Sequence, residues 1–330
     1  MYSNVNITNL QLRQKLLGVK ELLFNSYVFV LLFLPLTLVG YFSINRLSLT
    51  LGKIWLLGMS LWFYAYFNLK YLPIIVISVC FNYTMNRLIV RTTGTLPKKV
   101  WLIAAIVANI GILFYYKYYD FFVDNINAMF QSDFVLHRLI LPLGISFFTF
   151  QQLSYVIDSY KGEVPKYNFL DYALFVTYFP QLIAGPIVTH DEIVPQFADV
   201  LKKKINYANL SRGIMAFSIG LAKKVLLADT FGNAVNWGYG NVASLDATNA
   251  LLVMFFYAFQ IYFDFSGYCD MATGIGLMFN IDITMKANNT EASKNIEFSS
   301  HITSLLNELE TAFNSQNISE IDNILEELRR

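Results

Sequence analysis

Residues 247–281 decide the fold class, and they read ATNALLVMFFYAFQIYFDFSGYCDMATGIGLMFNI. Asp264 and Asp270 are the only charged residues in this run. About 20 mostly apolar residues are enough for a helix to cross the hydrocarbon core of a bilayer. The stretch therefore predicts a membrane-spanning helix that carries two carboxylates at membrane depth.

The composition of the whole chain leads to the same class. Of the 330 residues, 55% are hydrophobic and 14% are charged, and the mean hydropathy is +0.45. A soluble domain carries roughly 25% charged residues, and a soluble core cannot hide this much apolar surface. This composition excludes an ordinary soluble protein. We expect the lipid bilayer as a partner and no nucleic acid.

Further apolar runs predict an all-α fold, a polytopic transmembrane helical bundle of about seven spans. Lys and Arg are enriched in cytoplasmic loops, which places the basic segment 87–99 and the lysines at 202–204 in the cytoplasm. Charge-free runs near spanning length occur at 22–45, 54–69, 71–86, 100–116, 139–157 and 172–190, and 208–232 is apolar apart from four charged residues.

The run 172–190 conflicts with a simple alternation of spans, because both of its ends are expected in the cytoplasm. We therefore predict a re-entrant segment, which enters and leaves the membrane on one side. Pro180, Gly185 and Pro186 favour a broken helix there, and irregular backbone at membrane depth is tolerated where protein buries it.

Composition divides the chain into three parts. Residues 1–21 form a polar N-terminal leader, and 22–281 form the membrane-spanning body. Residues 282–330 hold 4 Lys and Arg against 9 Asp and Glu, with apolar residues at helical spacing. They predict a short, soluble, acidic tail of amphipathic helices on the cytoplasmic side.

Polar side chains inside apolar runs are costly and are often functional. A structural role is the alternative to a functional one for two groups of residues. Gln152 and Ser154 would join helices by hydrogen bonds, and Asp264 would form a structural ion pair with Lys223 or Lys224. The residues that stand out are Gln151, Gln152, Tyr155, Asp158, Gln181, Gly185, Pro186, Tyr262, Asp264, Ser266 and Asp270.

Histidine is scarce, and no metal site is expected. His137 adjoins an acidic loop predicted outside the cell, His190 ends the re-entrant run, and His301 belongs to the tail. His190 and His301 are the candidates for a catalytic base, although neither lies inside an apolar run.

Four motifs, in this order, resemble the membrane-bound O-acyltransferase family. The resemblance covers about residues 22–282 and is closest to the bacterial branch that acetylates alginate, peptidoglycan or other cell-envelope polysaccharides. The motifs are LLFNSY at 22–27, LPLGISFFTFQQ at 141–152, QLIAGPI at 181–187 and YFDFSGY at 262–268.

The resemblance implies an enzyme of the inner (plasma) membrane that moves an acyl group, most simply acetyl, from a cytoplasmic donor to a polysaccharide hydroxyl. The implied donor is acyl-coenzyme A, with no bound cofactor, and a periplasmic acyltransferase partner completes the transfer. The polar residues named above would then line the substrate passage.

The sequence departs from the family after the YFDFSGY motif. Family members continue with a segment rich in Trp, Arg and His, which carries the histidine regarded as catalytic, and the sequence after 281 has no such segment. The alternative to an enzyme is thus an inactive, truncated remnant or a membrane scaffold. A transporter or channel would explain the polar residues but not the ordered motifs.

Overall fold

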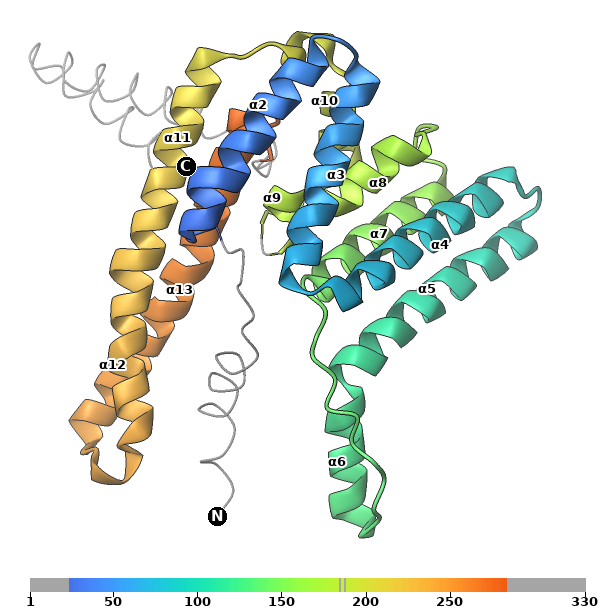
Figure 1. Cartoon of the computed structure of the whole chain (residues 1–330). Coiled ribbons are helices and arrows are strands. Elements are labelled where there is room, and N and C mark those ends of the chain that lie inside the picture. Colours follow the sequence, from blue (N-terminus) through green and yellow to red (C-terminus); the bar gives the residue numbers. More distant parts are fainter. Residues whose placement is uncertain (1–23, 184, 187, 284–330) are drawn as a thin grey trace, which may run out of the picture. The chain divides into compact units, whose positions relative to one another are not determined.

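The computed structural model describes residues 24–183, 185–186 and 188–283, and all of them belong to one compact unit. All regular structure in these ranges is helical, as predicted (Figure 1). The predicted leader at 1–21 and almost all of the predicted tail lie outside the described residues, so the three-part division stays a prediction.

The helices follow one another with short connections. Their bounds are η1 Phe29–Phe33, α2 Leu34–Asn45, α3 Leu49–Phe67, η2 Leu69–Tyr71, α4 Leu72–Arg91, α5 Thr95–Lys117, α6 Tyr119–Phe130, α7 Ile145–Lys161, α8 Phe169–Thr177, α9 Phe179–Leu182, α10 His190–Ala198, η3 Val200–Lys203, α11 Tyr207–Ala222, η4 Lys223–Ala228, α12 Asp229–Gly240, η5 Val242–Ser244 and α13 Ala247–Met278.

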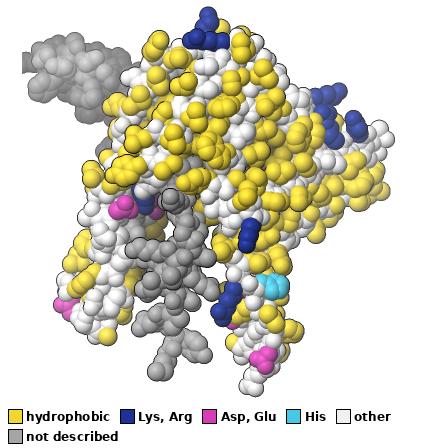
Figure 2. Space-filling view, viewed as in Figure 1, with side chains coloured by type: hydrophobic (Ala, Val, Ile, Leu, Met, Phe, Trp, Pro, Cys, Tyr) yellow, Lys and Arg dark blue, Asp and Glu magenta, His cyan; other side chains and the backbone are white. Residues whose placement is uncertain are grey.

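Three of these helices are long and apolar enough to cross a membrane: Leu69–Arg91, Thr95–Lys117 and Ala247–Met278. In the most apolar 18-residue stretch of α5, and likewise of α13, only 11% of the residues are buried within the described protein. Many of their apolar side chains are exposed, among them Val107 of α5 and Met254 of α13, as lipid contact requires. Figure 2 shows hydrophobic side chains over most of the visible face. The chain is therefore an integral membrane protein. The count of about seven spans stays a prediction.

Helix α7 begins later than the apolar run at 139–157 suggested. Residues 132–142 are not helical, and Gly144, with φ of +65°, directly precedes the helix. A Cβ atom at Gly144 would lie 2.3 Å from the carbonyl oxygen of Leu182. Only glycine permits this left-handed turn at such a close approach to α9.

The expected break in the segment 172–190 is present. Asn168 caps α8 by accepting a hydrogen bond from the backbone N–H of Asp171 at 2.8 Å, and the helix ends at Thr177. The four-residue helix α9 then restarts with Pro180 in its first turn. Both helices lie in the protein interior. Re-entry from one side of the membrane stays a prediction.

An aromatic core joins the N-terminal helices to α9. Phe33 and Phe179 meet edge to face with ring centroids 5.3 Å apart, and Phe63 lies 5.5 Å from Phe179. Phe24 and Phe29 extend the cluster, with their centroids 4.8 Å apart. Because lipid is as apolar as these rings, close packing rather than exclusion from water holds them together.

Helices α11, η4 and α12 form one continuous helix that packs along α13 (Figure 1). Glycines make the crossing close: a Cβ atom at Gly220 would lie 2.5 Å from the carbonyl oxygen of Gly267, and one at Gly213 would lie 2.5 Å from that of Gly274. Small residues are the usual means by which membrane helices approach each other closely.

Candidate functional site

The residues singled out from the sequence fall into separate groups. Helix α13 packs against α11, η4, α12 and α9, whereas α7 packs against α4, α5 and α8. The candidates on α13 therefore form one group. Those on α7 form two others, one around His190 and one around Gln152.

The first group is a lysine–aspartate cluster formed by Lys223, Lys224, Asp229, Asp264 and Asp270. The Nζ atom of Lys224 lies 2.7 Å from Asp264 and 3.2 Å from Asp229. The Nζ atom of Lys223 lies 2.6 Å from Asp270 and donates a hydrogen bond of 3.0 Å to the Ser266 hydroxyl. The ion pairing of Asp264 that the sequence left open is thus present.

Local backbone geometry builds this cluster. Both lysines lie at the start of the π-helical segment η4, and they face α13 just beyond the close crossing at Gly220 and Gly267. Single π turns within α-helices are rare and are frequent at functional sites. Tyr262, also on α13, is 63% exposed and lies outside the cluster.

A cavity of about 240 Å³ adjoins the Lys224–Asp264 pair. The hydroxyl of Tyr268 is buried and has no hydrogen-bond partner among the described residues. An open, mostly apolar cavity whose polar lining residues include Asn25 and the Lys224–Asp264 pair suits a small group that is apolar with a single polar end. Its walls are Phe24, Asn25, Ile183, Lys224, Asp264, Phe265, Tyr268 and Met271.

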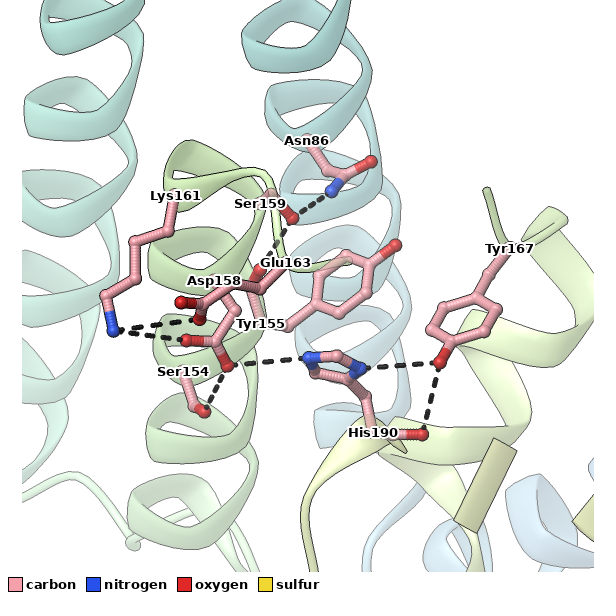
Figure 3. Close-up of polar contacts among 9 residues, drawn as sticks. All are labelled: Asn86, Ser154, Tyr155, Asp158, Ser159, Lys161, Glu163, Tyr167 and His190. Atoms are coloured by element: carbon pink, nitrogen blue, oxygen red, sulfur yellow. Dashed lines mark hydrogen bonds and ion pairs between the residues drawn. The ribbon is translucent and has the colours of Figure 1, made fainter. Parts of the chain in front are cut away.

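The second group centres on His190, whose side chain is only 5% exposed (Figure 3). Its Nε2 atom lies 3.4 Å from Oδ2 of Asp158, and its Nδ1 atom lies 3.4 Å from the hydroxyl of Tyr167. The ring of Tyr155 meets the imidazole edge to face at 5.4 Å. The predicted residues Tyr155, Asp158 and His190 are thus brought together with Tyr167, which was not predicted.

The carboxylate, the imidazole and the hydroxyl of the His190 cluster come from different parts of the chain. Asp158 lies near the C-terminus of α7 and accepts a hydrogen bond from Ser154 at 3.3 Å. His190 is the first residue of α10. Tyr167 lies in the connection between α7 and α8, where its backbone carbonyl accepts hydrogen bonds of 3.4 Å from Arg87 and from the Tyr83 hydroxyl. The His190 imidazole and the Tyr167 hydroxyl are therefore positioned by different parts of the chain.

The carboxylate of Asp158 determines which ring nitrogen of a neutral His190 carries the proton. An ionised Asp158 can only accept a hydrogen bond, so a neutral His190 carries its proton on Nε2. Nδ1 and the backbone carbonyl oxygen of His190 are then the two acceptors near the Tyr167 hydroxyl, at 3.4 and 3.5 Å. Burial, together with the nearby carboxylates of Asp191 and Asp171, raises the pKa of Tyr167 above its ordinary value. Tyr167 is thus a protonated phenol beside an oriented base.

Gln152 belongs to a buried hydrogen-bond network between helices. Its Oε1 accepts from Asn82 at 2.9 Å and from the Tyr172 hydroxyl at 3.2 Å, and its Nε2 donates to Ser78 at 3.0 Å. Asn82 also bonds to Asn109 on α5. The network ties α7 to α4, α5 and α8, so the helix-joining interpretation is confirmed for Gln152, whereas the Ser154 hydroxyl donates to Asp158 within α7.

The remaining predicted residues lie around α7 and α9. Gln151 is buried on α7. Gln181 donates a 2.5 Å hydrogen bond to the carbonyl oxygen of Phe175, while its Oε1 is buried without a partner among the described residues. Gly185, three residues after the end of α9, is buried, and Pro186 is half-buried. His301 lies outside the described residues.

Sequence reasoning missed several buried polar residues. Asn82 and Asn109 lie inside apolar runs, so the rule that selected Gln152 also applies to them. Lys53 and Asp171, which form a buried ion pair at 2.6 Å, lie just before apolar runs and carried no such signal. Across the described ranges, no three His, Cys, Asp or Glu side chains are grouped in a way that could hold a metal ion.

Comparison with known proteins identifies the family. Residues 91–307 match the model described as MBOAT, membrane-bound O-acyltransferase family. The chain belongs to this family. The resemblance read from the four motifs is thereby confirmed, and the relatives below fit the alginate and peptidoglycan branch.

This membrane-bound O-acyltransferase is similar to curated relatives over a range of sequence identities, as three examples show. The peptidoglycan O-acetyltransferase of Helicobacter pylori is 43% identical over 309 residues, 86% of this chain and 59% of the relative. The probable alginate O-acetylase AlgI of Pseudomonas aeruginosa is 36% identical over 83% of this chain and 53% of the relative. The teichoic acid D-alanyltransferase of Bacillus subtilis is 27% identical over 58% of this chain and 48% of the relative. The chain thus spans about half the length of the curated relatives that it matches.

Proposed function

We propose that this chain takes part in moving an acyl group, most simply acetyl, from a cytoplasmic acyl-coenzyme A donor to a hydroxyl of a cell-envelope polysaccharide. The observation that carries the proposal is the 43% identity to a peptidoglycan O-acetyltransferase over 86% of this chain. A periplasmic acyltransferase partner that completes the transfer belongs to the same proposal.

The cavity beside the lysine–aspartate cluster is the proposed place for the acyl group. Its mostly apolar lining suits a short acyl chain, and the Lys224 ammonium is a donor for a carbonyl oxygen. Donors fixed in a site of low dielectric constant stabilise the negative charge that develops on that oxygen during acyl transfer. Gln151, Gln181, Gly185, Pro186, Tyr262, Ser266 and Asp270 remain proposed lining residues of the passage.

The proposed topology has about seven spans in the inner membrane, with 172–190 as a re-entrant segment and the C-terminal tail in the cytoplasm. Support comes from the positions of Lys and Arg. The interruption of the helix between α8 and α9 favours re-entry, because their backbone lies in the protein interior.

The alternative is a membrane scaffold or an inactive remnant without transfer activity. One assay distinguishes the acyltransferase from the scaffold or remnant. The chain is expressed in a bacterium that lacks its own peptidoglycan O-acetyltransferase but keeps the periplasmic partner, and base-labile acetate is measured on isolated peptidoglycan.

Acetate above the empty-vector level supports the enzyme. Lys224→Met, which removes the cation from Asp264 beside the cavity and from Asp229, is expected to lower the yield at least about tenfold. Lys117→Met changes an exposed lysine and serves as the matched control. Acetate no higher than in the empty vector, with wild-type chain present in the membrane, refutes the proposal and leaves the scaffold.

A further inference from the structure

The Asp158–His190–Tyr167 array lies away from the cavity proposed above, and it has the connectivity of a nucleophilic triad. A hydroxyl faces one ring nitrogen of a buried imidazole, and a carboxylate faces the other (Figure 3). In such an arrangement the carboxylate orients the base, and the base activates the hydroxyl. We propose that Tyr167 is an acyl-accepting residue, charged by the acyl thioester donor; this inference rests on the proposed function for the identity of that donor.

The contacts define the path of the proton. The Nε2 atom of His190 lies 3.4 Å from Oδ2 of Asp158, and its Nδ1 atom lies 3.4 Å from the Tyr167 hydroxyl. The hydroxyl also lies 3.5 Å from the His190 carbonyl oxygen, so proton transfer to Nδ1 requires the hydroxyl hydrogen to turn from that oxygen to the ring. Catalytic hydrogen bonds are often this long in the absence of substrate and shorten when it binds. Nδ1 of His190 is therefore placed to accept the phenolic proton of Tyr167 when the substrate binds.

The covalent step balances without any further reactant. The phenolic oxygen of Tyr167 attacks the thioester carbonyl carbon, a carbon–oxygen bond forms, and the carbon–sulfur bond breaks. The proton moves from the phenol to Nδ1 of His190 and then to the departing thiolate. The products are an aryl ester on Tyr167 and a free thiol.

An aryl ester keeps the acyl group activated for the next transfer. Phenol and thiol leaving groups have similar acidities, with pKa values of about 10 and about 8.5. Exchange between the thioester and Tyr167 is therefore nearly balanced in free energy. Later transfer to a sugar hydroxyl, a much weaker acid, runs downhill.

Three cations near the array are the groups that would contact the phosphates of a coenzyme A thioester, and they lie among the carboxylates of Asp171 and Asp191. Arg87 is fixed beside Tyr167 by its hydrogen bond to the Tyr167 carbonyl and by contacts with Tyr83. Lys161 lies 3.8 Å from Asp158 with its side chain 54% exposed, and Lys166 directly precedes Tyr167. In the proposed topology these residues face the cytoplasm, where the donor is found.

Burial shields the His190 imidazole from solvent, whereas the Tyr167 hydroxyl is more accessible to a thioester. His190 is buried, and the Tyr155 ring covers one side of it. Tyr167 is only half-buried. This difference favours attack by Tyr167 over attack by a water molecule at Nδ1.

The test uses the full chain in proteoliposomes with acetyl-coenzyme A. Acylation is measured on the peptide that contains Tyr167 by mass spectrometry, and its loss with neutral hydroxylamine identifies an ester. We expect an ester on Tyr167 in the wild type and none in Tyr167→Phe. His190→Gln, which keeps a polar side chain, is expected to slow its formation at least about 100-fold, as the loss of a general base does. Asp158→Asn is expected to slow it as well.

Matched controls exclude non-enzymatic acylation and general loss of structure. His137→Gln and Glu163→Gln change an exposed histidine and a 63% exposed carboxylate, and both are expected to form the ester at the wild-type rate. Thermal unfolding of each variant shows whether it is folded. No ester on Tyr167, or an ester that forms equally fast in folded His190→Gln, overturns the inference.

Two further outcomes keep this inference apart from the proposed function. If the wild type acetylates peptidoglycan and Tyr167→Phe does so at the same rate, the acyl-tyrosine step is refuted while the proposed function stands. If a His190-dependent ester forms but no polysaccharide is acetylated, the inference is supported and the proposed acceptor is wrong.

Discussion

The buried ion pair between Lys53 of α3 and Asp171 of α8 gives a direct test of how charge is held in this membrane protein. The Nζ and Oδ1 atoms are 2.6 Å apart, and the two side chains are 11% and 12% exposed. Lys53→Met leaves the Asp171 carboxylate buried without its partner. Asp171→Leu does the same to the Lys53 ammonium.

The magnitude follows from the distance. At 2.6 Å and an effective dielectric constant of about 20, Coulomb's law gives an attraction of about 6 kcal/mol. Desolvation costs several kcal/mol for each ion, so the intact pair contributes little net stability. Each single substitution removes the attraction but keeps one desolvated charge, and we expect it to cost about 3–5 kcal/mol. The double substitution removes both charges and is expected to stay within about 1 kcal/mol of the wild type.

Thermal unfolding in lipid nanodiscs measures the effect. Each single variant is expected to unfold roughly 6–10 °C below the wild type, at about 2 °C per kcal/mol for a chain of this size. Lys117→Met, at an exposed position, provides the control. If both single variants unfold with the wild type, or the double variant is as unstable as the sum of the singles, the pair does not carry the energy assigned to it.

Three further predictions concern packing, hydrogen bonding and pH. Gly220→Leu is expected to destabilise the chain by about 1–3 kcal/mol, because its Cβ atom would lie 2.5 Å from a backbone oxygen of α13, whereas Gly58→Leu, with no atom within 4 Å, is expected to be tolerated in the same unfolding assay. Gln152→Leu is expected to cost about 1–3 kcal/mol in that assay by leaving buried groups on α4 and α8 unpaired, and an unchanged unfolding temperature would contradict this role. Because the folded-state pKa of Tyr167 is raised above 10.0, stability is unaffected by this group at lower pH and falls as pH rises from about 10 through the folded pKa. Tyr167→Phe should therefore lose less stability than the wild type between about pH 9 and pH 11 in denaturant titrations, and equal losses would refute the assignment.

Apolar periodicity predicted the helical class because lipid exposure leaves long runs without charge. It did not locate the start of α7, since the left-handed turn at Gly144 depends on the approach of α9, which is distant in sequence. It also could not reveal the π turn at Lys223–Ala228, which changes hydrogen bonding but not composition. Tertiary contacts determined both features.

The candidate site was predictable where charge stands against an apolar background. Asp264 and its lysine partners were found in this way, because a carboxylate between phenylalanines needs a cation. Tyr167 gave no such signal, since it lies in a polar connection among many tyrosines. Its place beside His190 follows only from the fold, which also brings the first residue of α10 beside the end of α7.

The π turn in η4 makes the pairing of charges depend on chain length as well as on side-chain identity. A π turn holds one residue more than an α turn, and each residue of an α-helix advances the chain by about 100°. Deleting a single residue just before Lys223 would restore an unbroken α-helix and rotate the two lysines relative to α13. Every charged side chain would still be present, yet Lys224 would no longer face Asp264. Single-residue deletions in this segment should therefore be as damaging as charge substitutions, a sensitivity that an alanine scan would not detect.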